Sequence, residues 1–390
     1  MVSLWKQAPE NTLASLRHAI LHNDGIEFDI RMTSDGELII HHDSKVSVPP
    51  KNRPRSISWV ENHTLDDLTD FGFLSLRSLL EDTTVRTQWK ENGKMGCLEF
   101  KRPHPRALYG GGIFGKRQHI SHIGAMMSKA ETLLDEYEIP HQNTVYYAFH
   151  TGMKSSVQNF NIQRPWANLT PYIPPFGTYY TKRMRGAIQF LTTPVSRLVQ
   201  NNKNSGASMA PCAVEYFVPP KNFIPLGRRG GLHGARAANV NAIQQGFPIY
   251  VWPAELKQEH HILSAGLTGL TDCSDPGMTW LPSGHLRWTQ PATLPLDSVQ
   301  TQILSSAEEQ NHLEIRKELL NEVTPWIECD ISRQKELIQF WRKRWQWKSS
   351  VEEILEHCNS TSPPWEAIRL IGHRGSGKTS RPVLDGNHST

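Results

Sequence analysis

Three acidic side chains stand at spacings that could build one chemical site. Glu27 and Asp29 lie two residues apart on a strand predicted over residues 26–30, so both leave the same face of that strand. Glu99 and Lys101 repeat this spacing on a second predicted strand. Carboxylates that point into a protein interior need a cation or basic groups to offset their charge. Oxygen donors with no cysteine nearby suit Mg²⁺ or Ca²⁺. An isolated pair is more often part of an ordinary salt bridge, but this combination favours a cation site.

A histidine ends the strand predicted over residues 37–43. His41, His42 and Asp43 follow its apolar run, and in a β/α barrel that end of a strand faces the catalytic rim. A lone histidine there is more often a hydrogen-bonded structural residue. Beside a carboxylate cluster, His42 becomes a candidate acid or base, because the pKa of an imidazole lies near neutral pH.

Strand and helix patterns alternate along the chain and must position these residues. Further strands are predicted at residues 95–101, 144–149, 213–217, 248–252, 267–272 and about 366–372, and helices at 13–20, 64–80, 235–245, 305–322, 332–347 and 351–358. Strands separated by helices favour a parallel sheet, and at this length a closed (β/α)8 barrel of the TIM type is its natural form. The predicted parts are a barrel body at 1–280 with a long insertion at 150–211, a helical connector at 281–365, and a strand and loop at 366–390 that complete the barrel and its site.

The composition limits the classes of function. Of the 390 residues, 38% are hydrophobic and 21% are charged, and the mean hydropathy is −0.49. These values exclude a disordered chain and a membrane protein. The formal charge is only +4, so neither a nucleic-acid partner nor stable membrane insertion is expected. The five cysteines are scattered and the first residues lack a signal sequence. We therefore expect a cytoplasmic enzyme that is a monomer or homodimer.

The order of several segments resembles that of a known family. The chain carries Pro-Glu-Asn-Thr-Leu at 9–13, Gly-Ile-Glu-Phe-Asp-Ile at 25–30, Asp-Gly at 35–36, His-Asp at 42–43 and Leu-Glu-Phe-Lys at 98–101. As a set, these segments resemble the core of the glycerophosphodiester phosphodiesterases, and residues 246–252 and 265–272 resemble that family's closing strands. The resemblance is good at the start of the chain and over 235–277, and poor in the middle.

One motif of the family stands in an unexpected position. In the family pattern a His-Arg-Gly tripeptide ends the first barrel strand, shortly before Glu-Asn-Thr. Nothing ahead of Glu10 supplies it here, and the tripeptide stands instead at His373, Arg374 and Gly375, after the C-terminal strand. We infer a circular permutation in which the first barrel strand has become the last. The first and last strands of a barrel are neighbours, and loop tips tolerate new termini.

The resemblance implies a metal-dependent phosphoric diester hydrolase that converts small glycerophosphodiesters to glycerol 3-phosphate and an alcohol. By motif, Glu27, Asp29 and Glu99 would hold one divalent cation (Mg²⁺ or Ca²⁺), His373, His42, Arg374 and Lys101 would be catalytic, and Arg374, Lys101, Trp252 and Glu10 would bind substrate. Glu10 would orient Arg374 rather than touch the metal. Departures from the family pattern at 148–150 and 252–255 leave the preferred alcohol open, and the attacking oxygen belongs either to water or to the substrate.

Two other hypotheses remain. Residues 372–379 match the G-x-x-x-x-G-K-[ST] pattern of a phosphate loop that binds nucleotides. A helix must follow such a loop, but Pro382 stands within its second turn. Alternatively, the barrel is catalytically inactive, or its C-terminal strand docks into a neighbouring copy as a swapped dimer.

Overall fold

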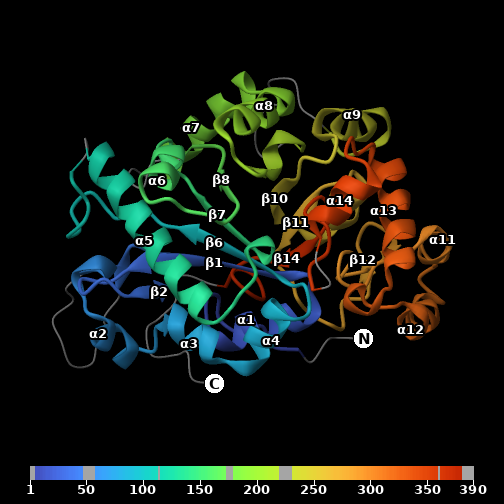
Figure 1. The fold of residues 1–390 in the computed structure, drawn as a ribbon, viewed down its shortest axis with the longest axis horizontal. Helices are drawn as coiled ribbons and strands as arrows, with labels where there is room; N and C mark the ends of the chain where they lie inside the picture. The colour runs from blue at the N-terminus through green and yellow to red at the C-terminus, as the bar shows by residue number, and fades with distance from the viewer. Residues whose placement is uncertain are drawn as a thin grey trace.

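The computed structural model describes residues 5–46, 58–112, 115–172, 179–218, 231–358 and 361–379. Eight parallel strands form a nearly closed barrel with helices around it (Figure 1). In the order in which neighbours pair, they are β8 (Trp166–Asn168), β7 (Thr144–Ala148), β6 (Met95–Phe100), β1 (Gly25–Met32), β14 (Leu370–Gly372), β11 (Thr268–Thr271), β10 (Ile249–Ala254) and β9 (Ala210–Ala213). A parallel bridge between Thr170 and Cys212 joins the two ends of this row. The predicted (β/α)8 barrel is confirmed.

The strand β1 shows how the sequence builds the barrel wall. All eight of its residues are buried, and Ile26, Phe28 and Ile30 belong to the main apolar core. Glu27 and Asp29 alternate with them and therefore turn to the opposite face. Burial of both faces is expected of a parallel strand in a sheet that helices cover.

The helices pack outside the strands, and side chains cap several of them. Thr12 Oγ1 accepts a hydrogen bond from the backbone N–H of Ser15 at the start of α1 (Leu13–His22). The other described helices that precede β11 in the sequence are α2 (Leu65–Asp70), α3 (Leu76–Glu81), α4 (Thr83–Lys90), α5 (Lys116–Glu136), α6 (Met153–Asn159), α7 (Tyr179–Thr192), α8 (Val195–Ser205), α9 (Gly234–Gln244) and α10 (Leu256–Ser264). Within the described ranges, no helix has both the length and the apolar character needed to cross a membrane.

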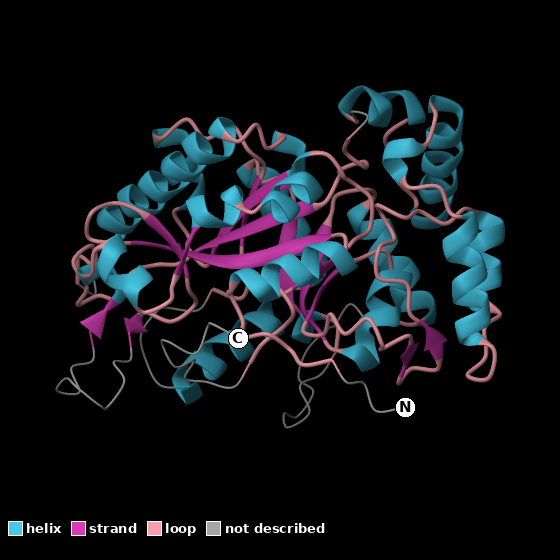
Figure 2. Ribbon diagram, turned by 90° about the horizontal axis from the view of Figure 1, so that it is seen from below, coloured by secondary structure: helices cyan, strands magenta, loops and turns pink. Residues whose placement is uncertain are grey.

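The predicted connector is largely helical and has its own core. It contains the hairpin β12 (Trp280–Leu281) and β13 (His285–Leu286) and the helices α11 (Ser298–Ser305), α12 (His312–Glu322), α13 (Ile331–Trp345) and α14 (Val351–His357), which lie on one side of the barrel (Figures 1 and 2). Trp326, Trp341, Trp345 and Trp347 are buried together. The tryptophan-rich end of α13 therefore packs inward.

Three local predictions differ from the structure. The helix predicted over 64–80 is split by Gly72, which has φ +83°, into α2, the short strand β5 (Leu74–Ser75) and α3. The strand predicted over 213–217 is instead a 3₁₀ turn, Val214–Tyr216, after β9. The segment 150–211, interpreted as an insertion, includes the barrel strand β8, whose three residues are too few to show a period.

The C-terminal strand β14 lies between β11 and β1. Ile371 is opposite Gly25 and Gly372 opposite Ile26, while Thr271 of β11 is opposite Gly372 on the other side. At the base of the barrel, the carboxylate of Asp24 accepts a hydrogen bond from the backbone N–H of Leu370 at 3.2 Å. The end of the chain thus completes the barrel beside the strand near its beginning.

Candidate active site

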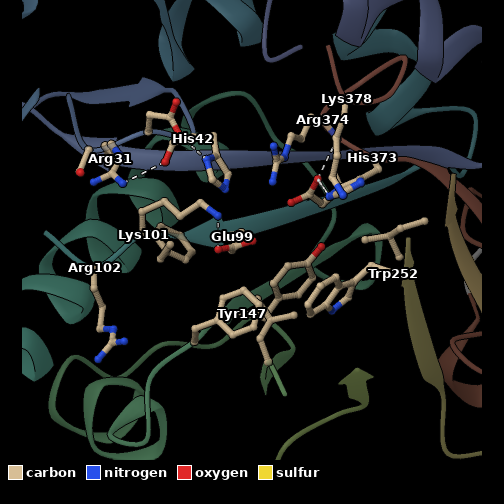
Figure 3. A pocket seen from close by; sticks show the side chains of 17 residues that line it. Arg31, His42, Glu99, Lys101, Arg102, Tyr147, Trp252, His373, Arg374 and Lys378 are labelled. Atoms are coloured by element: carbon tan, nitrogen blue, oxygen red, sulfur yellow. Dashed lines mark hydrogen bonds and ion pairs between the residues drawn. The ribbon is translucent and has the colours of Figure 1, made fainter. Parts of the chain in front are cut away.

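A cavity of about 340 Å³ opens at the rim where β1, β6 and β14 end. Seven of the predicted site residues line it, namely Glu27, His42, Glu99, Lys101, Trp252, His373 and Arg374 (Figure 3). The other two, Asp29 and Glu10, contact Arg374. The structure therefore brings together residues from both ends of the chain.

The three predicted metal ligands form one buried cluster. Each of Glu27, Asp29 and Glu99 offers a carboxylate oxygen, and these oxygens all lie within 4.8 Å of one another. Asp29 and Glu99 face each other because β1 and β6 are paired in register. Burial, followed by the charges of Asp29 and Glu99, raises the pKa of Glu27 well above its ordinary value.

This donor set fits a hard cation. All three ligands are carboxylate oxygens, which Mg²⁺ and Ca²⁺ prefer, and a divalent ion among them would offset the repulsion that raises the pKa of Glu27. Lys101 supplies part of the compensating charge, since its Nζ lies 2.6 Å from Asp29 Oδ1 and also contacts Glu99.

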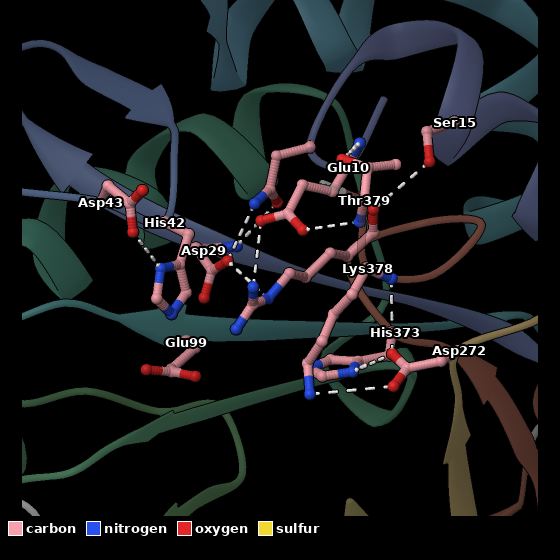
Figure 4. Close-up of polar contacts among 12 residues, drawn as sticks. Glu10, Ser15, Asp29, His42, Asp43, Glu99, Asp272, His373, Lys378 and Thr379 are labelled. Atoms are coloured by element: carbon pink, nitrogen blue, oxygen red, sulfur yellow. Dashed lines mark hydrogen bonds and ion pairs between the residues drawn. The ribbon is translucent and has the colours of Figure 1, made fainter. Parts of the chain in front are cut away.

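Arg374 joins the carboxylate cluster to the N-terminal segment. Its backbone N–H donates to Glu27 Oε2 at 2.8 Å, and its Nη1 donates to Glu10 Oε1 at 3.0 Å (Figure 4). Its Nε lies 3.4 Å from Asp29 Oδ2. The backbone of Arg374 has φ +54°, a left-handed conformation that a non-glycine residue adopts only where its surroundings hold it. Glu10 and Asp29 thus hold this guanidinium, and Glu27 holds the backbone that carries it.

The two histidines have the same kind of partner. His373 Nδ1 lies 2.7 Å from Asp272 Oδ1, and its Nε2 lies 3.9 Å from Glu27 Oε2. Burial raises the pKa of Asp272, but the charges of His373 and then Lys378 outweigh it and lower that pKa to about 2. His42 Nδ1 lies 2.8 Å from Asp43 Oδ1. A carboxylate at Nδ1 fixes the orientation of each ring and directs Nε2 to other partners.

Two residues that hold His42 were not singled out from the sequence. Nη2 of Arg31 donates to the carbonyl oxygen of His42 at 2.9 Å, and Nη1 donates to Glu61 at 2.7 Å. Arg31 continues the i, i+2 series of Glu27 and Asp29, and this could have revealed it. His42 itself follows β2 (Leu38–Ile40), which is not a barrel strand but pairs antiparallel with the end of β1.

The segment that matches the phosphate-loop pattern is already engaged with the protein. Four of its backbone N–H groups donate to other residues of the protein. The N–H of Arg374 donates to Glu27 Oε2, that of Ser376 to Ser15 Oγ, that of Lys378 to Asp272 Oδ1 and that of Thr379 to Glu10 Oε2. Residues 373–379 form turns without a helix, and Pro382 lies outside the described residues. A phosphate loop presents these N–H groups to the nucleotide, so this geometry argues against the nucleotide hypothesis.

Comparison with known proteins adds an independent observation. Residues 4–102 match the model of the Glycerophosphoryl diester phosphodiesterase family. Over these residues, about a quarter of the chain, the protein is similar to that family. The matched residues include the phosphodiesterase-family positions Glu10, Glu27, Asp29, His42 and Glu99, whereas His373 lies far outside them.

The curated relatives match only a short segment of this chain and of their own length. Glycerophosphodiester phosphodiesterases of Caldanaerobacter subterraneus and Bacillus subtilis are 36% identical over 64 residues and 39% identical over 61 residues. These matches cover 16% and 15% of this chain, and only 25% and 20% of the relatives. A putative glycerophosphoryl diester phosphodiesterase of Silicibacter pomeroyi has a solved structure that is 15% identical, covers 70% of this chain and 87% of its own, and gives a TM-score of 0.45.

Proposed function

We propose that this protein is a metal-dependent phosphodiesterase that hydrolyses glycerophosphodiesters to glycerol 3-phosphate and an alcohol. One observation carries the proposal. A carboxylate trio that fits a hard cation shares a cavity with two carboxylate-paired histidines and with Lys101 and Arg374. The match of residues 4–102 to the model of the Glycerophosphoryl diester phosphodiesterase family supports it.

The proposed roles follow from the chemistry of a phosphodiester. A divalent cation, Mg²⁺ or Ca²⁺, held by Glu27, Asp29 and Glu99 would neutralise charge on a phosphate oxygen. Arg374 and Lys101 add positive charge to the same cavity and stabilise the phosphoryl group as negative charge accumulates in the transition state. Glu10 holds Arg374 in position.

The two histidines transfer the protons. One takes the proton of the attacking oxygen and the other protonates the leaving alkoxide. Burial, and then the charges of Lys101 and Arg374, lower the pKa of His42 well below its ordinary value, so this ring is neutral at pH 7 and can accept a proton. Trp252 contributes to the wall against which the substrate lies.

We further propose that the chain is circularly permuted relative to its family. The strand that precedes His373 and Arg374 is the last one in the described part of the chain, and its parallel pairing with β1 supports this proposal. This strand completes its own barrel, so a monomer suffices for the cavity. The five cysteines are all free, in keeping with a cytoplasmic location.

The activity is tested by release of glycerol 3-phosphate from glycerophosphocholine in the presence of Mg²⁺ or Ca²⁺. We expect a chelator to abolish it, and His42→Ala to lower it about 10²- to 10⁴-fold. The control is His141→Ala, which removes an exposed histidine that contacts Asp135 and should leave the rate unchanged. Hydrolysis that persists in chelator would contradict the metal-dependent mechanism. ATP binding that Lys378→Ala abolishes, without diester hydrolysis, would favour the phosphate loop. Specific activity that rises with protein concentration would favour a swapped dimer.

A further inference from the structure

One buried polar group on the cavity wall has no part in the roles above. Tyr147 belongs to β7 and lies opposite Glu99 of β6 in register. Its side chain is 1% exposed and lines the cavity, between Glu99 and Trp252 (Figure 3). Within the described part of the chain, its hydroxyl oxygen has no hydrogen-bond partner.

An unpartnered hydroxyl at this depth is costly. A buried hydroxyl that loses its hydrogen bonds to water without replacement destabilises a fold by about 1–3 kcal/mol. The neighbouring thiol of Cys97 is buried as well, and a thiol is only a weak partner. A phenylalanine would fill the same space without this cost, and Tyr147 differs from the other buried tyrosines with unpartnered hydroxyls in that it lines the cavity, where a ligand can supply the partner.

The surroundings of the hydroxyl determine what it can do. Burial, and then the charge of Glu27, raises the pKa of Tyr147 well above its ordinary value. The group is therefore a permanent hydrogen-bond donor. Tyr147 lies on the other side of Glu99 from Arg374 (Figure 3), and its hydroxyl makes no hydrogen bond to Glu27, Asp29 or Glu99. A donor in this position complements a negatively charged oxygen held beside the trio.

We propose that Tyr147 donates a hydrogen bond to a phosphoryl oxygen of the bound phosphate ester. This inference rests on the proposed function. It adds a neutral, fixed donor from β7 to the cationic contacts of Arg374 and Lys101 and so completes the binding of the phosphoryl group from a third strand. No proton is transferred by Tyr147, because it acts as a donor that positions the phosphoryl group and stabilises its charge.

The substitution Tyr147→Phe tests this proposal with little structural change. We expect a fall in kcat/KM for glycerophosphocholine of about ten- to a hundredfold, the loss typical of one hydrogen bond to a charged oxygen. The affinities for glycerol 3-phosphate and for inorganic phosphate, measured by calorimetry, should fall by similar factors. The melting temperature of the ligand-free variant should equal or exceed that of the wild type, because an unpartnered hydroxyl has been removed.

A matched control is available on another barrel strand. Tyr250 of β10 is also fully buried with an unpartnered hydroxyl, but it neighbours Arg369 and is not among the described residues that line the cavity. Tyr250→Phe should therefore retain full activity and phosphate affinity, while its melting temperature changes in the same direction as that of Tyr147→Phe.

The outcomes separate this inference from the proposed function. If the wild type hydrolyses the diester and Tyr147→Phe matches it in kcat/KM and phosphate affinity, Tyr147 does not bind the phosphoryl group. A loss of affinity for glycerol 3-phosphate but not for inorganic phosphate would assign the hydroxyl to the glycerol and also overturn the inference. If the wild type hydrolyses nothing yet loses phosphate binding in Tyr147→Phe, the inference stands and the proposed function fails. A wild type that binds neither phosphate probe refutes both.

Discussion

Buried carboxylates lie at both ends of the barrel, and their surroundings differ: Asp24 directly precedes β1 at the base, whereas Glu27 and Asp29 of β1 and Glu99 of β6 lie at the rim. At the base of the barrel, Asp24 accepts hydrogen bonds from the backbone N–H groups of Ala292, Thr293 and Leu370 and from the hydroxyl of Thr293. Lys94 provides a nearby positive charge. At the rim, carboxylate oxygens of Glu27, Asp29 and Glu99 instead lie within 4.8 Å of one another, and burial, together with the charges of Asp29 and Glu99, raises the pKa of Glu27.

The difference separates a structural acid from the cluster that we propose to bind the cation. Asp24, directly before β1, accepts four hydrogen bonds from the connector and from β14. Groups of the protein itself therefore stabilise the charge of this carboxylate. The three rim carboxylates contact only two cationic side chains, Lys101 and Arg374, and a bound cation would supply the missing positive charge. Substitutions at the rim should therefore affect activity and ligand binding, while substitutions at the base should affect stability.

The largest expected effect is on the rate, at His373. His373→Ala should lower kcat/KM by about 10²- to 10⁴-fold, because one partner of the acid–base pair is lost. The free energy of unfolding in urea should fall by only about 1–2 kcal/mol, since a single side-chain hydrogen bond, to Asp272, disappears. A variant that keeps wild-type kcat/KM would exclude His373 from the reaction.

The base of the barrel should respond in the opposite way. Asp24→Asn leaves Lys94 buried without its charge partner, and the amide NH₂ group of the new side chain faces at least one backbone N–H donor. The free energy of unfolding in urea should therefore fall by about 3–5 kcal/mol. The folded protein should keep the wild-type kcat when the rate is divided by the concentration of active sites, which phosphate binding measures. Leu→Ala substitutions of similar cost elsewhere in the core would serve as the comparison. A stable but inactive Asp24→Asn protein would show that the base takes part in function.

A smaller effect distinguishes the two groups of acids by ligand binding. Glu27→Gln removes one negative charge from the rim, so the metal-free protein should be as stable as the wild type or more stable. The rise in melting temperature that Ca²⁺ or Mg²⁺ gives the wild type should disappear. At about a hundredfold excess over the dissociation constant, that rise corresponds to about 2.7 kcal/mol. An undiminished rise in the variant would mean that the ion binds elsewhere, and the other such cluster among the described residues, half-buried Glu131 with exposed Asp135 and His141, would then be examined.

Local sequence rules predict the rim acids better than they predict the partners of the histidines. Alternation along a strand is a local property, so Glu27 and Asp29 could be assigned to one face before the fold was known. Asp272 meets His373 across 101 residues because β11 and β14 are neighbours in the barrel, and no spacing in the sequence reveals this contact. The tripeptide motif did predict that β14 belongs beside β1. The hydroxyl of Tyr147 could not be foreseen, because the absence of a partner is visible only once all neighbours are known.

The smallest expected effect is a pH dependence that belongs to the base alone. Burial lowers the pKa of Lys94 from 10.5 to about 8, although the charge of Asp24 opposes this. Between these two values the unfolded chain binds more protons at this site than the folded chain does, so the contribution of Lys94 to stability rises with pH. The slope of stability against pH is at most about 1.4 kcal/mol per pH unit.

Buried thiols such as Cys358, whose pKa burial raises to about 12, act in the opposite direction, but they are common to the wild type and to Lys94→Met. The difference in urea stability between these two proteins should therefore grow in favour of the wild type from pH 7.5 to pH 9.5. A difference that stays constant would mean that Lys94 keeps an ordinary pKa, and that the hydrogen bonds from its Nζ to Asn23, Gln290 and Thr293 fully offset the cost of its burial.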